Sequence, residues 1–281
     1  LIQVYDVGKE GEYYYFSMEY VDGKTVEDLI EEAPGRRLEI GEAVDIVIQV
    51  VRAIHYYKDF DIVHRDIKPS NIMITRSGLV KLGDFGFVKS QLDRELGTDG
   101  MVLGTPDYIA PEQAMGKSNV DYRADVYALG VSFYHMLTGK PPFDGTPTQV
   151  MVKHTRENLP DPRELRPSLG DDVVNVISKM MAKSPDDRYS NLNVLFADLE
   201  RLQETHRSKA PVRIEVGKSS VMRALKVEQA KVGELKDQLV TLEEANQRLQ
   251  TRQMILIGAA VIGFVWALIM TVLLLSSGGE A

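Results

Sequence analysis

The chain has 281 residues, a hydrophobic fraction of 44% and a formal net charge of −8. A hydrophobic fraction of this size is ordinary for a folded protein. The acidic balance excludes a general nucleic-acid-binding protein, because phosphate backbones require clustered Lys and Arg. The absence of cysteine excludes disulfides, thiolate metal sites and cysteine nucleophiles.

The start of the chain predicts a β-hairpin. Residues 1–7 and 13–20 are short apolar or aromatic runs, and residues 8–11 between them contain two glycines. Two such runs around a glycine-containing turn are typical of paired antiparallel strands. Because the chain opens on Leu1 inside a predicted strand, we expect the sequence to lack its natural start and any targeting signal before it.

Helical and strand patterns alternate further along the chain. Apolar residues recur at helical spacing over residues 40–60 and predict a helix. Residues 72–74 and 79–82 predict two short strands around a Ser-Gly turn. From Arg123 onward the pattern is helical, with breaks at residues 139–142 and 160–167, which contain Gly and Pro.

Three motifs in a fixed order carry the chemistry. Residues 64–71 read HRDIKPSN, residues 84–86 read DFG, and residues 110–112 read APE. Any one of them alone is a weak signal, but their order and spacing together are specific. On these motifs the chain resembles the eukaryotic-type Ser/Thr protein kinases, especially the membrane-bound bacterial ones.

The resemblance implies transfer of the ATP γ-phosphate to Ser or Thr hydroxyls of protein substrates. Asp66 is then expected to orient the attacking hydroxyl, and Lys68 to lie near the moving phosphoryl group. Asn71 and Asp84 are expected to hold Mg²⁺ (or Mn²⁺), which prefers oxygen ligands. Each acid alone would be read as a turn or cap residue, so the prediction depends on the four residues together.

The resemblance also implies a nucleotide site. Residues 18–23 read MEYVDG and are similar to the hinge between the two lobes of a kinase. There the backbone groups of Glu19 and Val21 are expected to bond the adenine edge. Met73 is expected to pack beneath the adenine ring. Without its context the hinge motif would be an ordinary strand end.

Control of activity is expected in the segment that ends at the APE motif. The resemblance implies that Arg65 binds a phosphate on this segment. Thr98, flanked by glycines, is the predicted phosphorylation site; the alternative is a plain polar loop residue. Thr105 is expected to bond Asp66 and Lys68 and to favour Ser/Thr substrates.

Several residues are expected to act as supports. The resemblance implies a buried ion pair between Glu112 and Arg188, and it implies that Asp125 holds the backbone of the catalytic loop. His64 is expected to pack and form hydrogen bonds rather than to transfer protons. The other histidines show no partner pattern, and we assign no metal site to them.

The C-terminal part predicts a linker and a stalk. Residues 206–220 are basic and predict a linker, either a solvated loop or a contact to anionic lipid. Residues 221–253 carry heptads in which six of eight a and d positions are Leu or Val, and Asn246 sits at an a position. A buried Asn there favours a parallel two-stranded coiled coil, whereas Gly233 weakens the helix. A parallel homodimer and a single amphipathic stalk both stay open.

A membrane span is predicted after the stalk. Residues 254–275 form a run of 22 residues without a charge, long enough at about 1.5 Å per residue to cross a hydrocarbon core of about 30 Å. Arg248 and Arg252 precede the run, so the N-terminal part is expected in the cytoplasm and residues 276–281 form a short extracytoplasmic tail. Together with the resemblance, this implies a single-pass protein of a bacterial inner membrane.

The predicted fold class is α+β. Residues 1–205 are expected to form a partial protein kinase domain: the hinge and a mostly helical C-lobe, with only the last strands of the N-lobe. A Gly-rich loop, its strand Lys and the partner Glu are absent from the sequence, so residues 1–281 alone are expected to be poorly active and the full-length protein active. The alternatives are a membrane-tethered pseudokinase scaffold and, more weakly, a small-molecule phosphotransferase.

Overall fold

The computed structural model describes residues 1–10, 13–83 and 106–207. These residues all belong to the first of the two units into which the chain divides, Leu1–Val216. The predictions for Asp84, Thr98, Thr105, the coiled coil and the membrane span concern residues outside these ranges. Among the helices that the structure describes, none has the length and apolar character needed to span a membrane.

A two-stranded antiparallel hairpin begins the chain. Strands β1 (Val4–Glu10) and β2 (Tyr13–Met18) pair from Val4 opposite Met18 to Glu10 opposite Tyr13. The structure confirms the predicted hairpin, but residues 8–10 of the predicted turn belong to β1. Gly8 lies opposite Tyr15 in the register of the two strands, and a Cβ on Gly8 would lie 2.5 Å from the far end of this exposed side chain.

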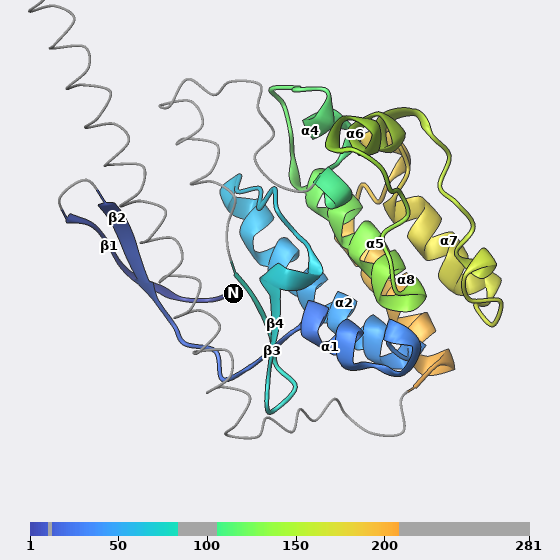
Figure 1. Cartoon of the computed structure of the whole chain (residues 1–281), viewed down its shortest axis with the longest axis horizontal. Helices are drawn as coiled ribbons and strands as arrows, with labels where there is room; N and C mark the ends of the chain where they lie inside the picture. Colours follow the sequence, from blue (N-terminus) through green and yellow to red (C-terminus); the bar gives the residue numbers. More distant parts are fainter. Residues whose placement is uncertain (11–12, 84–105, 208–281) are drawn as a thin grey trace, which may run out of the picture. The chain divides into compact units, whose positions relative to one another are not determined.

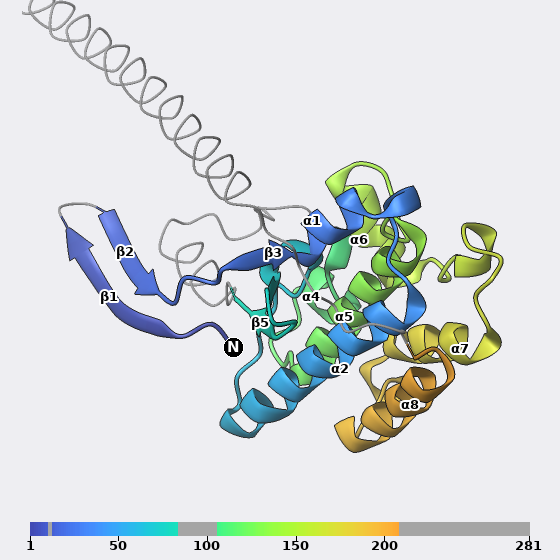
Figure 2. The same ribbon diagram turned by 90° about the horizontal axis from the view of Figure 1, so that it is seen from below.

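A second, three-stranded antiparallel sheet has the order β3-β4-β5; Figure 2 labels its outer strands, β3 and β5. Its strands are β3 (Gly23–Thr25), β4 (Ile72–Thr75) and β5 (Val80–Leu82). Ile72 and Ile74 are fully buried while Met73 between them is half-buried. Side chains alternate between the two faces of a strand, so Met73 lies on the face opposite the core.

Apart from the loops, the rest of the described chain is helical (Figure 1). Helix α1 (Val26–Glu32) begins at a capping box between Thr25 and Asp28. The predicted helix over residues 40–60 is α2 (Ile40–Tyr57), followed by the short 3₁₀ helix η2 (Lys58–Phe60). The other α-helices are α4 (Pro111–Ala114), α5 (Tyr122–Thr138), α6 (Pro147–Arg156), α7 (Asp171–Met180) and α8 (Leu192–Thr205).

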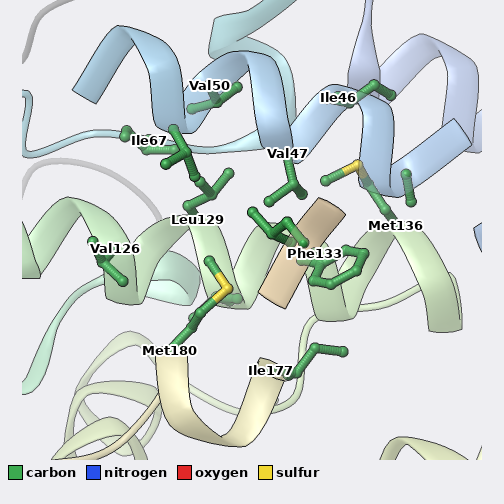
Figure 3. Packing of buried hydrophobic residues seen from close by; sticks show 14 of the residues in the cluster. Ile46, Val47, Val50, Ile67, Val126, Leu129, Phe133, Met136, Ile177 and Met180 are labelled. Carbon is green, nitrogen blue, oxygen red and sulfur yellow. The ribbon is translucent and has the colours of Figure 1, made fainter. Parts of the chain in front are cut away.

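Helix α5 forms the centre of the core, as Figure 3 shows with side chains from α2 and α7 packed on either side of it. It is buried on all faces from Ala124 to Tyr134, as expected of a helix enclosed by its neighbours. The contact with α7 is close, because a Cβ on Gly130 would lie 2.8 Å from Met180. Helix α5 ends at Thr138 and is capped by Gly139, whose φ of +86° is a left-handed conformation that glycine favours.

Candidate active site

Three of the predicted catalytic residues converge in the loop between α2 and β4. The Nζ of Lys68 lies 3.0 Å from Oδ2 and 3.2 Å from Oδ1 of Asp66. The Nδ2 of Asn71 donates to Oδ2 of Asp66 at 3.0 Å and to its backbone oxygen at 2.7 Å. The side chains of Asp66 and Lys68 are each 26% exposed, so a substrate can reach them.

The donor set here suits a hard cation. Because the amide nitrogen of Asn71 turns toward Asp66, its Oδ1 is left without a hydrogen bond to any described residue. A carboxamide oxygen of this kind is a ligand that Mg²⁺ accepts. The backbone oxygen of Asn71 also accepts the N–H of Gly83 at 3.0 Å. The residue preceding Asp84 therefore lies beside Asn71, although Asp84 itself is outside the described residues.

Asp125 on α5 holds the backbone of this loop. Its Oδ1 accepts the N–H of Arg65 at 2.9 Å, and its Oδ2 accepts the N–H of His64 at 2.9 Å and the hydroxyl of Tyr57 at 2.8 Å. Burial raises the pKa of Asp125 to about 6, and these three donors oppose the rise. By accepting these three hydrogen bonds, the side chain of Asp125 fixes the loop to the core, as the sequence predicted.

Arg65 adopts an unfavourable backbone conformation. Its φ is +67°, a left-handed value that costs a residue with a Cβ about 1–2 kcal/mol. The bond to Asp125 helps to maintain it. The Nε of Arg65 is buried and has no hydrogen-bond partner within the described part of the chain. Its predicted phosphate partner would lie in residues 84–105, so that role stays a prediction.

His64 is fully buried and bridges the loop to the end of β5. Its Nε2 lies 2.9 Å from the oxygen of Gly83, and the N–H of Asp66 donates to its Nδ1 at 3.3 Å. A carbonyl only accepts and an amide N–H only donates, so the neutral ring carries its proton on Nε2. His64 thus supports the loop by hydrogen bonds, as the sequence suggested.

The predicted hinge residues follow β2. The N–H of Glu19 already donates to Gln3 at 2.7 Å, so an adenine contact at Glu19 would use its carbonyl. The carboxylate of Glu19 pairs with Lys81 on β5 at 2.9 Å. The side chain of Val21 is buried. Met73 is the register partner of Lys81, so the two side chains share the face of the sheet away from the core.

Sequence reasoning missed the role of Lys81. The signal was available in the alternation of β5, because Leu82 is buried and its neighbour must point to the other face. The pattern does not reveal that the carboxylate of Glu19 lies within reach of Lys81. The ion pair links Glu19, in the predicted hinge, to β5.

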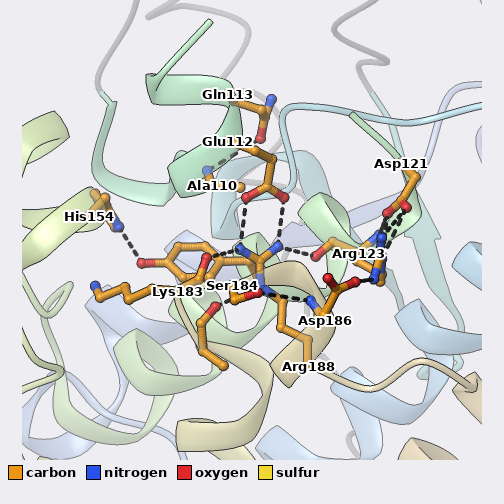
Figure 4. A network of polar contacts seen from close by, with 12 residues as sticks. Ala110, Glu112, Gln113, Asp121, Arg123, His154, Lys183, Ser184, Asp186 and Arg188 are labelled. Carbon is orange, nitrogen blue, oxygen red and sulfur yellow. Dashed lines mark hydrogen bonds and ion pairs between the residues drawn. The ribbon is translucent and has the colours of Figure 1, made fainter. Parts of the chain in front are cut away.

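The predicted ion pair between Glu112 and Arg188 is present and buried (Figure 4). The two N–H···O contacts measure 2.7 and 2.8 Å, and the side chains are 5% and 0% exposed. The remaining guanidinium N–H groups donate to the backbone oxygens of Ala182, Arg123 and Lys183. Every donor of Arg188 is therefore satisfied, and the APE motif is fixed to the helical core.

A buried histidine forms a further hydrogen-bonded link between two elements, and no sequence pattern predicts it. The hydroxyl of Tyr127 lies 2.9 Å from Nδ1 of His154 on α6, and Nε2 lies 2.9 Å from the backbone oxygen of Asp107. Burial lowers the pKa of His154 to about 4, so the ring is neutral at pH 7. His154 joins α6 to the segment that precedes the APE motif.

Comparison with known proteins agrees with this geometry. The protein kinase domain family matches residues 1–199. The chain is 38% identical over 205 residues to the probable serine/threonine-protein kinase CPE1738 of Clostridium perfringens, covering 73% of this chain and 30% of that protein. It is 37% identical over 222 residues to the serine/threonine-protein kinase PknB of Mycolicibacterium smegmatis, covering 75% and 34%.

The fold is also similar to a solved structure. The crystal structure of the Mycobacterium tuberculosis PknI kinase domain matches with a TM-score of 0.58 and 28% identity, over 72% of this chain and 71% of that one. The chain spans about a third of the length of the curated relatives above, 30% and 34%. Because the family matches residues 1–199, and because the fold and the loop described above agree with it, the chain belongs to the protein kinase domain family.

Proposed function

We propose that the protein transfers the γ-phosphate of ATP to Ser or Thr hydroxyls of protein substrates. The observation that carries the proposal is the convergence of Lys68 and Asn71 on one carboxylate, both 3.0 Å from Oδ2 of Asp66. The relatives named as Ser/Thr kinases support the same chemistry. ATP and Mg²⁺ (or Mn²⁺) are the cofactors that the family generally uses.

In the proposed step the substrate oxygen forms a bond to the γ-phosphorus while the bond from that phosphorus to the β–γ bridging oxygen breaks. ADP leaves with the bridging oxygen, and Asp66 orients the attacking hydroxyl and accepts its proton. Lys68 places positive charge beside the phosphoryl group. A bound Mg²⁺ would neutralise phosphate charge, with Asn71 and Asp84 as the expected ligands.

Phosphate transfer tests the proposal. The full-length product of the gene is incubated with radiolabelled ATP, Mg²⁺ or Mn²⁺ and a mixture of Ser/Thr peptides. We expect incorporation that falls by roughly 10²–10⁴ in Asp66→Asn. If no divalent metal supports transfer by the full-length protein, the alternative of a pseudokinase scaffold is favoured instead.

The C-terminal predictions form part of the proposal. Residues 254–275 would anchor the protein in a bacterial inner membrane with the kinase domain in the cytoplasm, behind a linker at 206–220. The heptads over residues 221–253 would pair two copies in parallel and raise the local concentration of one kinase domain around another. Deletion of residues 254–275 should move the protein from the membrane to the soluble fraction; retention in the membrane would contradict the anchor.

A further inference from the structure

Gln113, the residue that follows the APE motif, contacts the catalytic loop. It is the third residue of α4, and its Oε1 accepts the N–H of the cap residue Ala110 at 3.3 Å (Figure 4). Its Nε2 donates to the backbone oxygen of Arg65 at 3.2 Å. One side chain therefore joins the start of α4 to the loop that carries Asp66.

The bond to Arg65 completes a set of contacts around a single left-handed residue. Arg65 has a φ of +67°, and the peptide unit that follows it contains its own carbonyl and the N–H of Asp66. Gln113 binds that carbonyl, and Nδ1 of His64 accepts that N–H at 3.3 Å. The peptide unit before Arg65 is held through its N–H by Asp125 at 2.9 Å. Both peptide units that flank the left-handed turn are thus fixed.

We infer that Gln113 is a positioning residue: by binding the carbonyl of Arg65 it holds the turn that directs Asp66 toward the substrate. The inference rests on the proposed kinase function and extends it, because Gln113 acts through Asp66. The amide chemistry is specific. A carboxylate of the same shape would still accept the N–H of Ala110, as capping boxes with Glu do, but it has no donor for the carbonyl of Arg65.

The test compares matched Gln-to-Glu substitutions at two capping boxes. Gln113→Glu keeps the cap and removes the donor to Arg65. Gln149→Glu is the control, because Gln149 is the third residue of α6 and its Oε1 accepts the N–H of Thr146 at 2.9 Å. Gln113→Leu removes both contacts without adding charge. The readouts on the full-length protein are kcat, KM for ATP and peptide, and hydrogen exchange of the catalytic-loop amides.

For Gln113→Glu and Gln113→Leu we expect kcat to fall roughly tenfold while both KM values change less than about threefold. The amide hydrogens of Arg65 and Asp66 should exchange faster in both variants than in wild type. In Gln149→Glu they should exchange at the wild-type rate. A kcat per folded molecule within about twofold of wild type, or unchanged exchange in both variants, overturns the inference.

The same experiment separates this inference from the proposed function. Equal rates of phosphate transfer by wild type and Asp66→Asn would contradict the kinase assignment. The exchange of the Arg65 and Asp66 amides would still decide whether Gln113 holds the loop. If Asp66→Asn loses phosphate transfer but Gln113→Glu keeps the wild-type kcat and amide exchange, the positioning role alone is contradicted.

Discussion

The catalytic loop and the site around Arg188 use adjacent residues of the same short helix in different ways. Glu112 makes contacts of 2.7 and 2.8 Å to Arg188 in a place where the two side chains are 5% and 0% exposed. Its neighbour Gln113 makes longer contacts, 3.2 and 3.3 Å, to the backbone of the loop and of its own cap. The catalytic loop contains a left-handed residue and side chains that are a quarter exposed.

The buried ion pair contributes mainly to the stability of the fold, whereas the partly exposed loop is suited to catalysis. A buried charge pair is costly to break from one side, because the remaining ion has no partner. A partly exposed acid such as Asp66 contributes less to folding, and it is available to a substrate. We therefore expect changes at Arg188 to destabilise the domain and changes at Asp66 to stop phosphate transfer without destabilising it.

The largest expected effect on folding is at the ion pair. Arg188→Ala leaves Glu112 buried and unpaired, so the free energy of unfolding should fall by about 3–5 kcal/mol. Denaturant unfolding followed by circular dichroism measures it. Arg201→Ala is the control, since its pair with Asp198 is 72% exposed on the Arg side. A loss at Arg188 no larger than at Arg201 would contradict a supporting role.

A smaller effect depends on pH. The native His154 stays neutral down to a pKa of about 4, whereas an unfolded His binds a proton below about 6.5. The unfolded state therefore gains protons first, and stability should fall by up to about 3 kcal/mol as the pH drops from 6.5 to 4.

The variant His154→Gln isolates this contribution. His135, whose pKa burial also lowers to about 4, stays in both proteins and cancels in the comparison. We expect the loss of unfolding free energy between pH 7 and pH 4 to be smaller in His154→Gln than in wild type. Equal losses in the two proteins would show that His154 is not the group that resists protonation.

The smallest effect is expected at Tyr57. Tyr57→Phe removes one of three donors to Asp125 and should lower the free energy of unfolding by about 1–2 kcal/mol, with a modest loss of transfer because His64 and Arg65 still hold Asp125. Tyr134→Phe is the matched control, a buried tyrosine whose hydroxyl bonds to no residue in the described part. Equal costs for the two substitutions would count against the Tyr57 contact.

Local patterns in the sequence predicted much of the fold and of the candidate site. The helix over residues 40–60 follows from apolar spacing, which each turn of α2 repeats. Asp66, Lys68 and Asn71 lie within six residues of one another, so one loop brings them together. Glu112 and Arg188 are distant in the chain, and only the family resemblance linked them. Asp84, Thr98, Thr105, the coiled coil and the membrane span stay predictions.

Other contacts could not be predicted from the sequence, because they join residues that are far apart in the chain and no repeating pattern connects them. The pair of Lys81 and Glu19 spans 62 residues, and the contact of Gln113 with Arg65 spans 48. Residues 8–10 were wrongly predicted to belong to the turn for a different reason: a glycine within a strand and a glycine within a turn give the same signal in the sequence.

The most direct test measures phosphate transfer and unfolding free energy on the same preparations of wild type and Asp66→Asn. We expect transfer to fall by at least about 10² while the free energy of unfolding changes by less than about 1 kcal/mol. Transfer by Asp66→Asn at the wild-type rate would contradict the catalytic role of the loop.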